Sequence, residues 1–329
     1  MTHGFNRRAV LVSLAAASGW ALPPAGRAAA YPARGVKLLV GAPPGGPTDF
    51  IARIYADALG VQFGQGFVVE NRPGASGTLA AEAVAKSPAD GYTLLVAGPG
   101  AITTAPHLFK LGYDAANDFV PLNMLGAGAF VLVVHPSLEV GSLQALIALA
   151  RSQPGKLAFG SGGHGSAGHL CTEYFASASG VTMFHVPYKG DSQAINDLLA
   201  GQIQMMFTSP NVAVPASKAG KLRALAVTSR DRLASLPEVP TVSESGFKDF
   251  EYLGWVGAFA PAALPRHTMA SLVQAWHKAR VTPSVRSRLD EHAMRAPEGL
   301  VAGAPLDQFI KAESNRLGAL IRDKGIKVQ

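Results

Sequence analysis

A strand that runs into a glycine-rich loop and then into a helix occurs twice in this chain, and this unit constrains the fold most strongly. In the first unit, the apolar run Val36–Val40 precedes the loop Gly41–Pro47. In the second, Leu157–Phe159 precedes Gly160–Gly165, which has four glycines in six positions. A helical apolar pattern follows each loop. Because the first amides of a helix lack internal partners and carry positive partial charge, both units are predicted to bind an anion.

The apolar runs outside these loops predict alternating strands and helices. The predicted strands are 36–40, 67–70, 92–97, 130–134, 157–159, 181–186, 203–207, 222–228 and 252–259. The predicted helices are 48–59, 78–86, 143–151, 166–178, 191–200, 268–280, 284–292 and 305–324. This α/β alternation indicates mostly parallel sheets flanked by helices, whose ligands bind at the carboxyl ends of the strands.

The chain length of 329 residues and the wide separation of the two units predict two lobes that face one ligand. The chain is expected to cross between the lobes twice, near Gly126–Val131 and near Tyr252–Gly257, and two crossings form a hinge. We therefore expect residues 31–128 and 255–329 in the first lobe and residues 129–254 in the second. The C-terminal helices are expected to pack on the first lobe.

Residues 1–30 have the pattern of an export signal. The pair Arg7–Arg8 forms a basic start, residues 9–22 are apolar, and Ala28–Ala30 provides the small residues of a cleavage site. The alternative is a membrane anchor, for which the apolar run is too short. We expect a periplasmic protein whose mature chain begins at Tyr31, and the arginine pair leaves both the general and the twin-arginine export routes open.

The charge pattern does not favour nucleic-acid binding. Removal of residues 1–30 takes away three of the 29 basic residues and none of the 22 acidic residues, which leaves a formal charge of +4. No run of lysine and arginine exceeds two residues, and basic residues do not alternate with aromatic ones. A mildly positive protein attracts small anions instead.

Two nucleotide-binding motifs are incomplete. Gly160–Gly165 matches the dinucleotide fingerprint GxGxxG, but the next strand ends in HVPYK without the acid that binds the ribose. Gly41–Thr48 is similar to a phosphate-binding P-loop, but Pro47 replaces the lysine that contacts the phosphates. We therefore expect no nucleotide cofactor.

Hydrolase and metal chemistry are not favoured either. Ser166 precedes a helix and lacks the nucleophile-elbow pattern, because His164 replaces the first glycine. Its expected role is to cap the helix, and His169 is expected to be a hydrogen-bonded structural residue. Cys171 is the only cysteine, so it is expected to be a buried core residue. The nine histidines are scattered, so no metal site is predicted.

Asp49 stands at the start of the first helix. Stabilisation of the helix start is the favoured role for this carboxylate, and acceptance of a hydrogen bond from a ligand is the alternative.

These residues together resemble the Bug family, the extracytoplasmic solute receptors of the tripartite tricarboxylate transporter system. The similarity covers essentially the whole mature chain. It is carried by VGAPPGGPTDFIAR, VENRPGASGTLAAEAVAKSPADGYTLL, FGSGGHGSAGHL, VPYKGDSQAINDLLAGQIQMMF, LRALAVTSRDRLASLPEVPTVSESGF and GWVGAFAPAALP. The resemblance implies a two-lobed periplasmic binding protein of type II that closes on a carboxylate, which is held by loop amides, hydroxyls and water.

The resemblance also implies the ligand contacts. In the first lobe these are Pro44, Gly45, Gly46, Thr48, Asp49, Ser76, Gly98 and Ala101. In the second lobe they are Ser161, Gly162, Gly163, His164, Gly165, Ser166, Tyr188 and Thr208. Two positions depart from the family pattern and leave the ligand open: His164, in the variable middle of its loop, and Asp191, where such proteins often have glycine.

The expected function is therefore capture of a small carboxylate by a monomer that delivers it to two membrane subunits of a transporter. No metal, cofactor or enzymatic activity is expected. Two alternatives remain: a periplasmic sensor that acts on a membrane kinase, and a carboxylate-processing enzyme that uses His164, Ser166 or His169.

Overall fold

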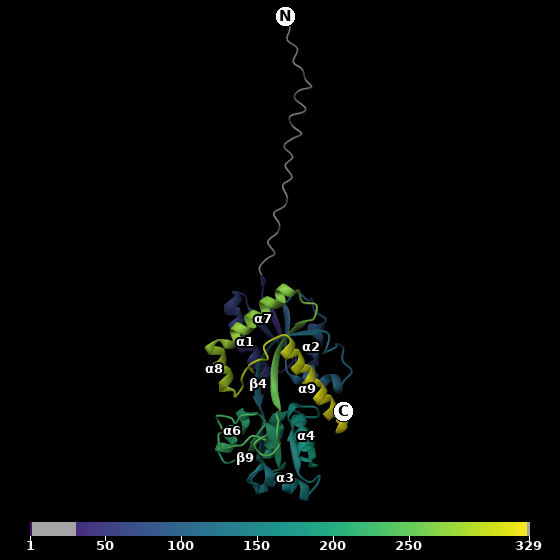
Figure 1. The fold of residues 1–329 in the computed structure, drawn as a ribbon, viewed down its shortest axis with the longest axis vertical. Helices are drawn as coiled ribbons and strands as arrows, with labels where there is room; N and C mark the ends of the chain where they lie inside the picture. Colours follow the sequence, from purple (N-terminus) through teal and green to yellow (C-terminus); the bar gives the residue numbers. More distant parts are fainter. Residues whose placement is uncertain (2–30, 328–329) are drawn as a thin grey trace.

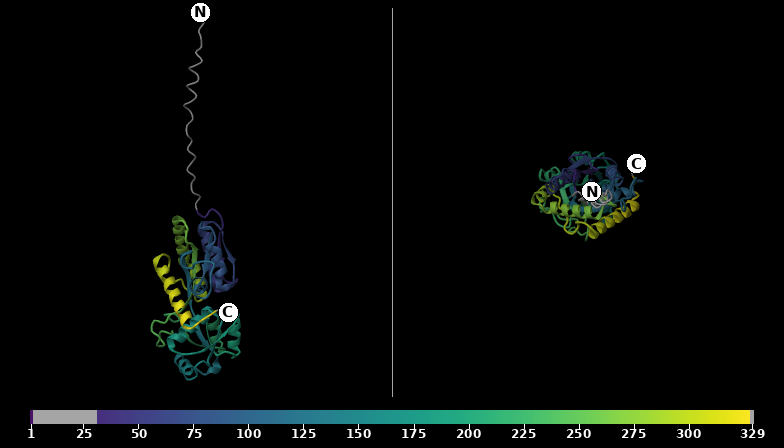
Figure 2. Two further views of the ribbon diagram at one scale, coloured as in Figure 1. Left: turned by 90° about the vertical axis from the view of Figure 1, so that its right-hand side faces the viewer. Right: turned by 90° about the horizontal axis from the view of Figure 1, so that it is seen from above.

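The computed structural model describes Met1 and residues 31–327, so the predicted export signal lies almost entirely outside the described residues. The described chain forms two lobes, one above the other along the long axis (Figures 1 and 2). Within residues 31–327, no helix is both long and apolar enough to cross a membrane. The two-lobed α/β architecture predicted from the sequence is confirmed.

The first lobe is built on a mixed sheet in the order β2-β1-β3-β10-β4. The strands are β1 (Val36–Val40), β2 (Phe67–Asn71), β3 (Thr93–Ala97), β4 (Phe119–Ala129) and β10 (Leu253–Pro261). β1 is parallel to β2 and β3, and β10 is antiparallel to β3 and β4. Helical crossovers between β1, β2 and β3 bring the carboxyl ends of these strands to one edge.

Helices cover both faces of this sheet because successive strand residues point to opposite faces. Leu38 packs under α1 (Pro47–Phe63), α7 (Arg266–Val281) and α8 (Pro283–Glu291). Leu39 packs under α2 (Thr78–Ala85), the π-helical turn η2 (Gly100–Thr104) and the first half of α9 (Ala304–Asp323).

The second lobe has a mixed sheet in the order β7-β6-β8-β5-β9. Its strands are β5 (Val131–Val134), β6 (Ala158–Ser161), β7 (Phe184–Pro187), β8 (Met205–Thr208) and β9 (Arg223–Val227). The helices α3 (Leu143–Ser152) and α4 (Ala167–Ser179) cover one face, and α5 (Asp191–Leu199) and α6 (Pro210–Lys218) cover the other. β6 is parallel to β7 and β8, whereas β5 is antiparallel to β8 and β9.

One α-helix and one long strand were not predicted. The helix α6 carries Pro210 at its first position and Pro215 inside, and proline inside a segment argues against a helix. The strand β4 contains Pro121, Gly126 and Gly128, residues that are depleted in strands. Tertiary packing overrides the local preference in both cases.

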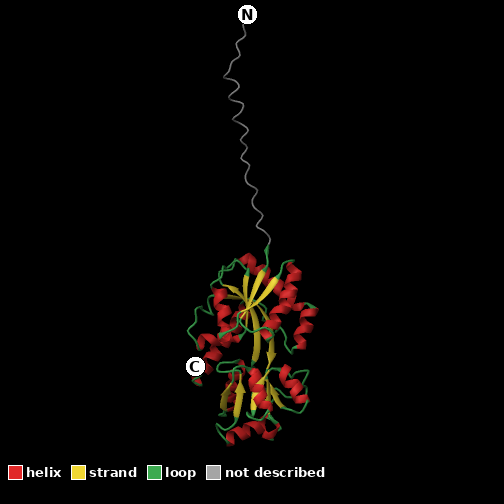
Figure 3. Ribbon diagram, turned by 180° about the vertical axis from the view of Figure 1, so that it is seen from behind, coloured by secondary structure: helices red, strands yellow, loops and turns green. Residues whose placement is uncertain are grey.

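The two lobes are joined where β4 continues into β5 and where the chain returns into β10 (Figure 3). Gly128 pairs with Gly254 at this point. The Thr228 hydroxyl, at the end of β9, accepts a hydrogen bond from the Phe130 amide at 2.8 Å and donates one to the Tyr252 carbonyl at 2.5 Å. One side chain thus links both crossing segments.

The helix α9 contacts both lobes (Figures 1 and 2). Leu306, in its first turn, belongs to the first lobe's core, whereas Leu317 and Ile321 belong to the core of the second lobe. The Arg316 guanidinium lies 4.5 Å from the ring centre of Tyr174, on α4. The predicted division at residues 128/129 and 254/255 remains a prediction, and α9 gives the lobes a third contact beside the two crossings.

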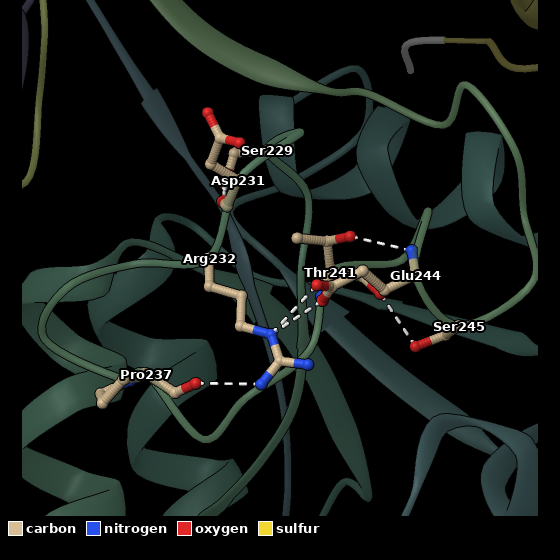
Figure 4. A network of polar contacts seen from close by, with 7 residues as sticks. All are labelled: Ser229, Asp231, Arg232, Pro237, Thr241, Glu244 and Ser245. Atoms are coloured by element: carbon tan, nitrogen blue, oxygen red, sulfur yellow. Dashed lines mark hydrogen bonds and ion pairs between the residues drawn. The ribbon is translucent and has the colours of Figure 1, made fainter.

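The segment 235–246, expected to be irregular, is held by a polar network rather than by a helix or strand (Figure 4). Arg232 donates to the Glu244 carboxylate at 2.9 Å and to the Pro237 carbonyl at 3.0 Å. The same carboxylate accepts the Thr241 amide at 2.7 Å, and the Thr241 hydroxyl accepts the Glu244 amide at 2.9 Å. This reciprocal pairing is that of a capping box.

Candidate ligand-binding site

A cavity of about 620 Å³ lies between the lobes, at the carboxyl ends of the parallel strands. Both strand-loop-helix units contribute to its wall, as do the crossing segments. Its polar lining side chains are Thr48, Ser76, Thr104, Ser166, Asp191, Ser209, Asn211, Tyr252 and His292. Its larger apolar side chains are Phe50, Phe130, Trp255, Val256 and Met294.

Close packing of loop backbones explains the glycines on the first-lobe side. A Cβ atom on Gly41 would lie 2.5 Å from the Cα atom of Gly77, so only glycine allows this contact. Gly77 also has a φ of +91°, which disfavours other residues. The loops after β1 and β2 therefore pack directly against each other and form one wall.

The buried Asp49 carboxylate holds the first loop in place by hydrogen bonds and an ion pair. The side chain is 2% exposed and accepts hydrogen bonds from the Gly45 amide at 2.9 Å and the Asn71 side-chain amide at 2.8 Å. It also forms an ion pair with Arg53 at 3.0 Å. Burial raises the pKa of this carboxyl, but the hydrogen bonds from Arg53, Gly45 and Asn71 outweigh burial, so the pKa lies below its ordinary value.

Internal hydrogen bonds leave only some of the first loop's donors for a ligand. The Gly45 amide is taken by Asp49, and the Gly46 amide donates to the Pro43 carbonyl. Pro47 has no amide hydrogen. The donors that remain include the Gly41 and Ala42 amides, the Thr48 and Asp49 amides in the first turn of α1, and the Thr48 hydroxyl. Gly41, Ala42 and Thr48 line the cavity.

The second loop is bonded internally in the same way. The Gly163 amide donates to Ser161 Oγ at 3.2 Å, the Gly165 amide donates to His169 Nδ1 at 3.0 Å, and the Ser166 amide donates to the Gly163 carbonyl. Ser166 caps α4, as predicted, by accepting the His169 amide at 3.3 Å. Because Ser166 is the cap, the Ala167 and Gly168 amides have no acceptor within α4. Two free donors again lie in the first turn of a helix.

The structure brings some of the expected contact residues to the cavity wall. These are Thr48, Ser76, Gly98, Ala101, Gly165 and Ser166. The others lie outside the lining: Pro44, Gly45, Gly46, Asp49, Ser161, Gly162, Gly163, His164, Tyr188 and Thr208. Among them, the Tyr188 hydroxyl donates to Asp197 at 2.7 Å, and Ser161 Oγ lies 2.7 Å from His185 Nε2.

Other lining residues were missed from the sequence. Ser209, Pro210 and Asn211 line the cavity at the start of α6, a helix that was not predicted. Phe50 was assigned to no site, although its ring stacks on His292 with centres 3.5 Å apart. A serine followed by proline is itself a helix-start signal, and it would have identified this third helix start.

Asp191 is the only aspartate or glutamate among the described lining residues, which include no lysine or arginine. The carboxylate lies beside the second loop, since a Cβ atom on Gly162 would come within 2.6 Å of Asp191 Oδ1. The residue is exposed overall, but neighbouring protein partly buries its carboxylate. This burial raises the pKa of Asp191, and the Gly162 amide opposes the shift.

Three histidines that are scattered in the sequence lie together at the second loop, to which His164 itself belongs. The rings of His169 and His185 stack with centres 3.9 Å apart and planes at 10°, and the His164 ring stands at 88° to both. Their ligand atoms lie within 4.8 Å of one another. Burial and the neighbouring histidines lower the pKa of His169 to about 3, and burial and His164 lower that of His185 to about 4.

This cluster supports the loop in its present arrangement rather than a metal ion. His169 Nδ1 already accepts the Gly165 amide. The lone pairs of imidazole lie in the ring planes, so two rings stacked in parallel do not point at one ion. The three nitrogens would suit a transition metal only after the rings turn.

Comparisons with known proteins agree with this geometry. Residues 51–326 match the TctC family, described as the tripartite tricarboxylate transporter family receptor. The chain is 35% identical to Protein BugT of Bordetella pertussis, over 91% of this chain and 92% of BugT. It also resembles the structure of Rpa4515 of R. palustris with adipate, with 36% identity, a TM-score of 0.77, and coverage of 90% of this chain and 99% of that one.

A second solved relative is MatC (Rpa3494) of Rhodopseudomonas palustris with bound malate, with 31% identity and a TM-score of 0.75. The alignment covers 88% of this chain and all of MatC. The protein belongs to the TctC family of tripartite tricarboxylate transporter receptors, the Bug family that its loops and crossing segments resemble.

Proposed function

We propose that this protein captures a small carboxylate in the cavity between its lobes. The observation that carries this proposal is the cavity wall, which presents the first turns of α1, α4 and α6 but no lysine or arginine among the described lining residues. Helix starts of this kind stabilise an anion with uncharged donors. Thr48, Ser166 and Ser209 add hydroxyl groups at the same three places.

Binding of adipate by Rpa4515 and of malate by MatC supports a carboxylate ligand for this chain. The family match supports delivery of the ligand to a tripartite transporter. We further propose that the receptor is a monomer, that it is exported to the periplasm, and that it delivers its ligand to two membrane subunits. A sensor for a membrane kinase would use the same site and differ only in its partner.

Catalysis is not the function that the site favours. Ser166 Oγ is occupied as the cap of α4, and His169 Nδ1 accepts a backbone amide, so these two side chains do not form a nucleophile and base pair. Incubation of the purified protein with carboxylic acids, followed by mass spectrometry, should return the acids unchanged. Formation of a product would contradict a binding role.

Calorimetry with carboxylic acids and their methyl amides tests the proposal. The variant Ala167→Pro tests whether the first amide of α4 donates to the carboxylate. Ala167 is the first residue of α4, where proline is tolerated, and Ser166 has the extended backbone (φ −64°, ψ 158°) that precedes proline well. The substitution removes one donor. Since a hydrogen bond to a charged group contributes about 1.5–3 kcal/mol, every acid that binds should lose at least about tenfold in affinity.

Arg266→Pro is the matched control, because Arg266 is the first residue of α7 and does not line the cavity. It should leave affinity unchanged. If the methyl amides bind as well as the acids, or if Ala167→Pro has no effect, the carboxylate is not held at the start of α4.

A further inference from the structure

The cavity has an electrostatic imbalance for a simple carboxylate ligand. A bound carboxylate would add a second negative charge to a space whose described lining already contains Asp191 and no lysine or arginine. Two other titratable side chains, His292 and Tyr252, belong to the lining residues. His292 stacks on Phe50 and bonds to the Arg288 carbonyl through Nδ1, and Tyr252 is buried.

The carboxylate of Asp191 has the Gly162 amide as a neutral partner, which does not balance its charge. Among the described residues it takes part in no ion pair, unlike Asp49, which is held by Arg53. It is the first residue of α5, where a carboxylate stabilises the helix start modestly. That role does not require Asp191 to line the cavity, and this residue does line it.

The position of Asp191 separates it from the anion donors. The carboxylate lies beside Gly162, at the start of the second loop, whereas the first-turn amides of α4, at Ala167 and Gly168, come after the end of that loop. A ligand whose carboxylate is held at α4 therefore has another part that can approach Asp191. Among the other lining residues, Phe50, Phe130 and Trp255 are large and apolar.

We infer that Asp191 is a specificity-determining residue that selects carboxylates bearing a protonated amine, or a similar strong donor, on an apolar body. This inference rests on the proposed function. A cationic group on the ligand restores charge balance in the cavity and pairs with the carboxylate of Asp191. A dicarboxylate instead places a second anion near Asp191, and like charges in a partly desolvated site repel.

Two matched sets of acids test this inference by calorimetry. The aromatic set is para-aminomethylbenzoate, terephthalate and para-toluate, and the aliphatic set is ε-aminocaproate, adipate and caproate. In each set the shape is kept while the group far from the carboxylate is an ammonium, a second carboxylate or a methyl group. In at least one set, the wild-type protein should bind the amine more tightly than the diacid by about tenfold or more.

Asp191→Asn should bring the amine-to-diacid ratio close to one without weakening the methyl compound, whose single carboxylate loses a like-charged neighbour. A merely structural role for Asp191 would lower the affinity for all three acids by the same factor. Asp323→Asn removes an equal charge from an exposed position outside the cavity, and it should leave the ratio as in the wild-type protein.

The outcomes separate the two proposals. A wild-type preference for the diacids, or a ratio that Asp191→Asn does not change, refutes the role of Asp191 and leaves carboxylate capture standing. Uptake of a proton with a diacid, detected in buffers of different ionisation enthalpy, would show that Asp191 is neutralised and also refutes it. If no acid of either set binds at millimolar concentration, both proposals fail.

Discussion

Replacement of Asp49 by alanine measures how far one buried carboxylate holds the first loop in its binding conformation. The substitution leaves the Gly45 amide and the Asn71 side-chain amide without their charged acceptor. Each such bond contributes about 1.5–3 kcal/mol, and the low end applies here because Gly45 is exposed and Asn71 is partly exposed. The ion pair with Arg53, whose side chain is 49% exposed, adds less than about 1 kcal/mol.

The free energy of unfolding of Asp49→Ala should therefore fall by about 3 kcal/mol at neutral pH, as measured by urea denaturation. The matched control is Asp57→Ala, on the same helix. Asp57 pairs with Arg288 at 3.0 Å, but its side chain is 73% exposed, so the loss should stay below about 1 kcal/mol.

The effect should also depend on pH. The hydrogen bonds hold the folded-state pKa of Asp49 below the ordinary value of 3.8. A depressed pKa contributes stability that is fully present above the unfolded-state value and is lost as the pH falls through the folded-state value. The difference between wild type and Asp49→Ala should therefore shrink below about pH 3.8. Equal losses for Asp49→Ala and Asp57→Ala, or a pH-independent difference, would refute this account of the loop.

Three further predictions concern the cap, the hinge and the N-terminus. Ser166→Ala and Ser142→Ala each remove a helix cap and should each lower the free energy of unfolding by about 0.5–2 kcal/mol. Only Ser166→Ala should weaken carboxylate binding, because Ser142 does not line the cavity. If the two variants bind a carboxylate with equal affinity, the result counts against the proposed site. The radius of gyration from small-angle X-ray scattering should decrease when a carboxylate saturates the protein, and identical profiles would rule out closure at the crossings. N-terminal sequencing of protein from the native cell envelope should begin at or near Tyr31, and an intact chain from Met1 would contradict export with cleavage.

Single residues with a local role, such as helix-capping serines, allowed the starts of helices to be predicted correctly. Ser142 and Ser166 cap α3 and α4 as expected, because a serine before an apolar helical pattern acts within its own turn. The wall around the cavity was harder to predict. The Gly45 and Gly163 amides looked available from the sequence, but Asp49 and Ser161 accept them.

Contacts between segments that are far apart in the chain could not be predicted from the spacing of residues in the sequence. His185 reaches His169 because β7 pairs in parallel with β6, which places His185 opposite Phe159. Hydrophobic periodicity does not give this register. The same limit applies to Phe50 and His292, which stack across more than two hundred residues of chain.

The contact of α9 with both lobes has a consequence for how the protein unfolds. Leu306 completes one core, while Leu317 and Ile321, on the same helix, complete the other. Loss of structure in either lobe would expose part of this helix, so the lobes are coupled through a shared element rather than through a flexible linker. Differential scanning calorimetry should show one cooperative transition with agreement between the calorimetric and van't Hoff enthalpies, and two resolved peaks would show that the lobes melt independently.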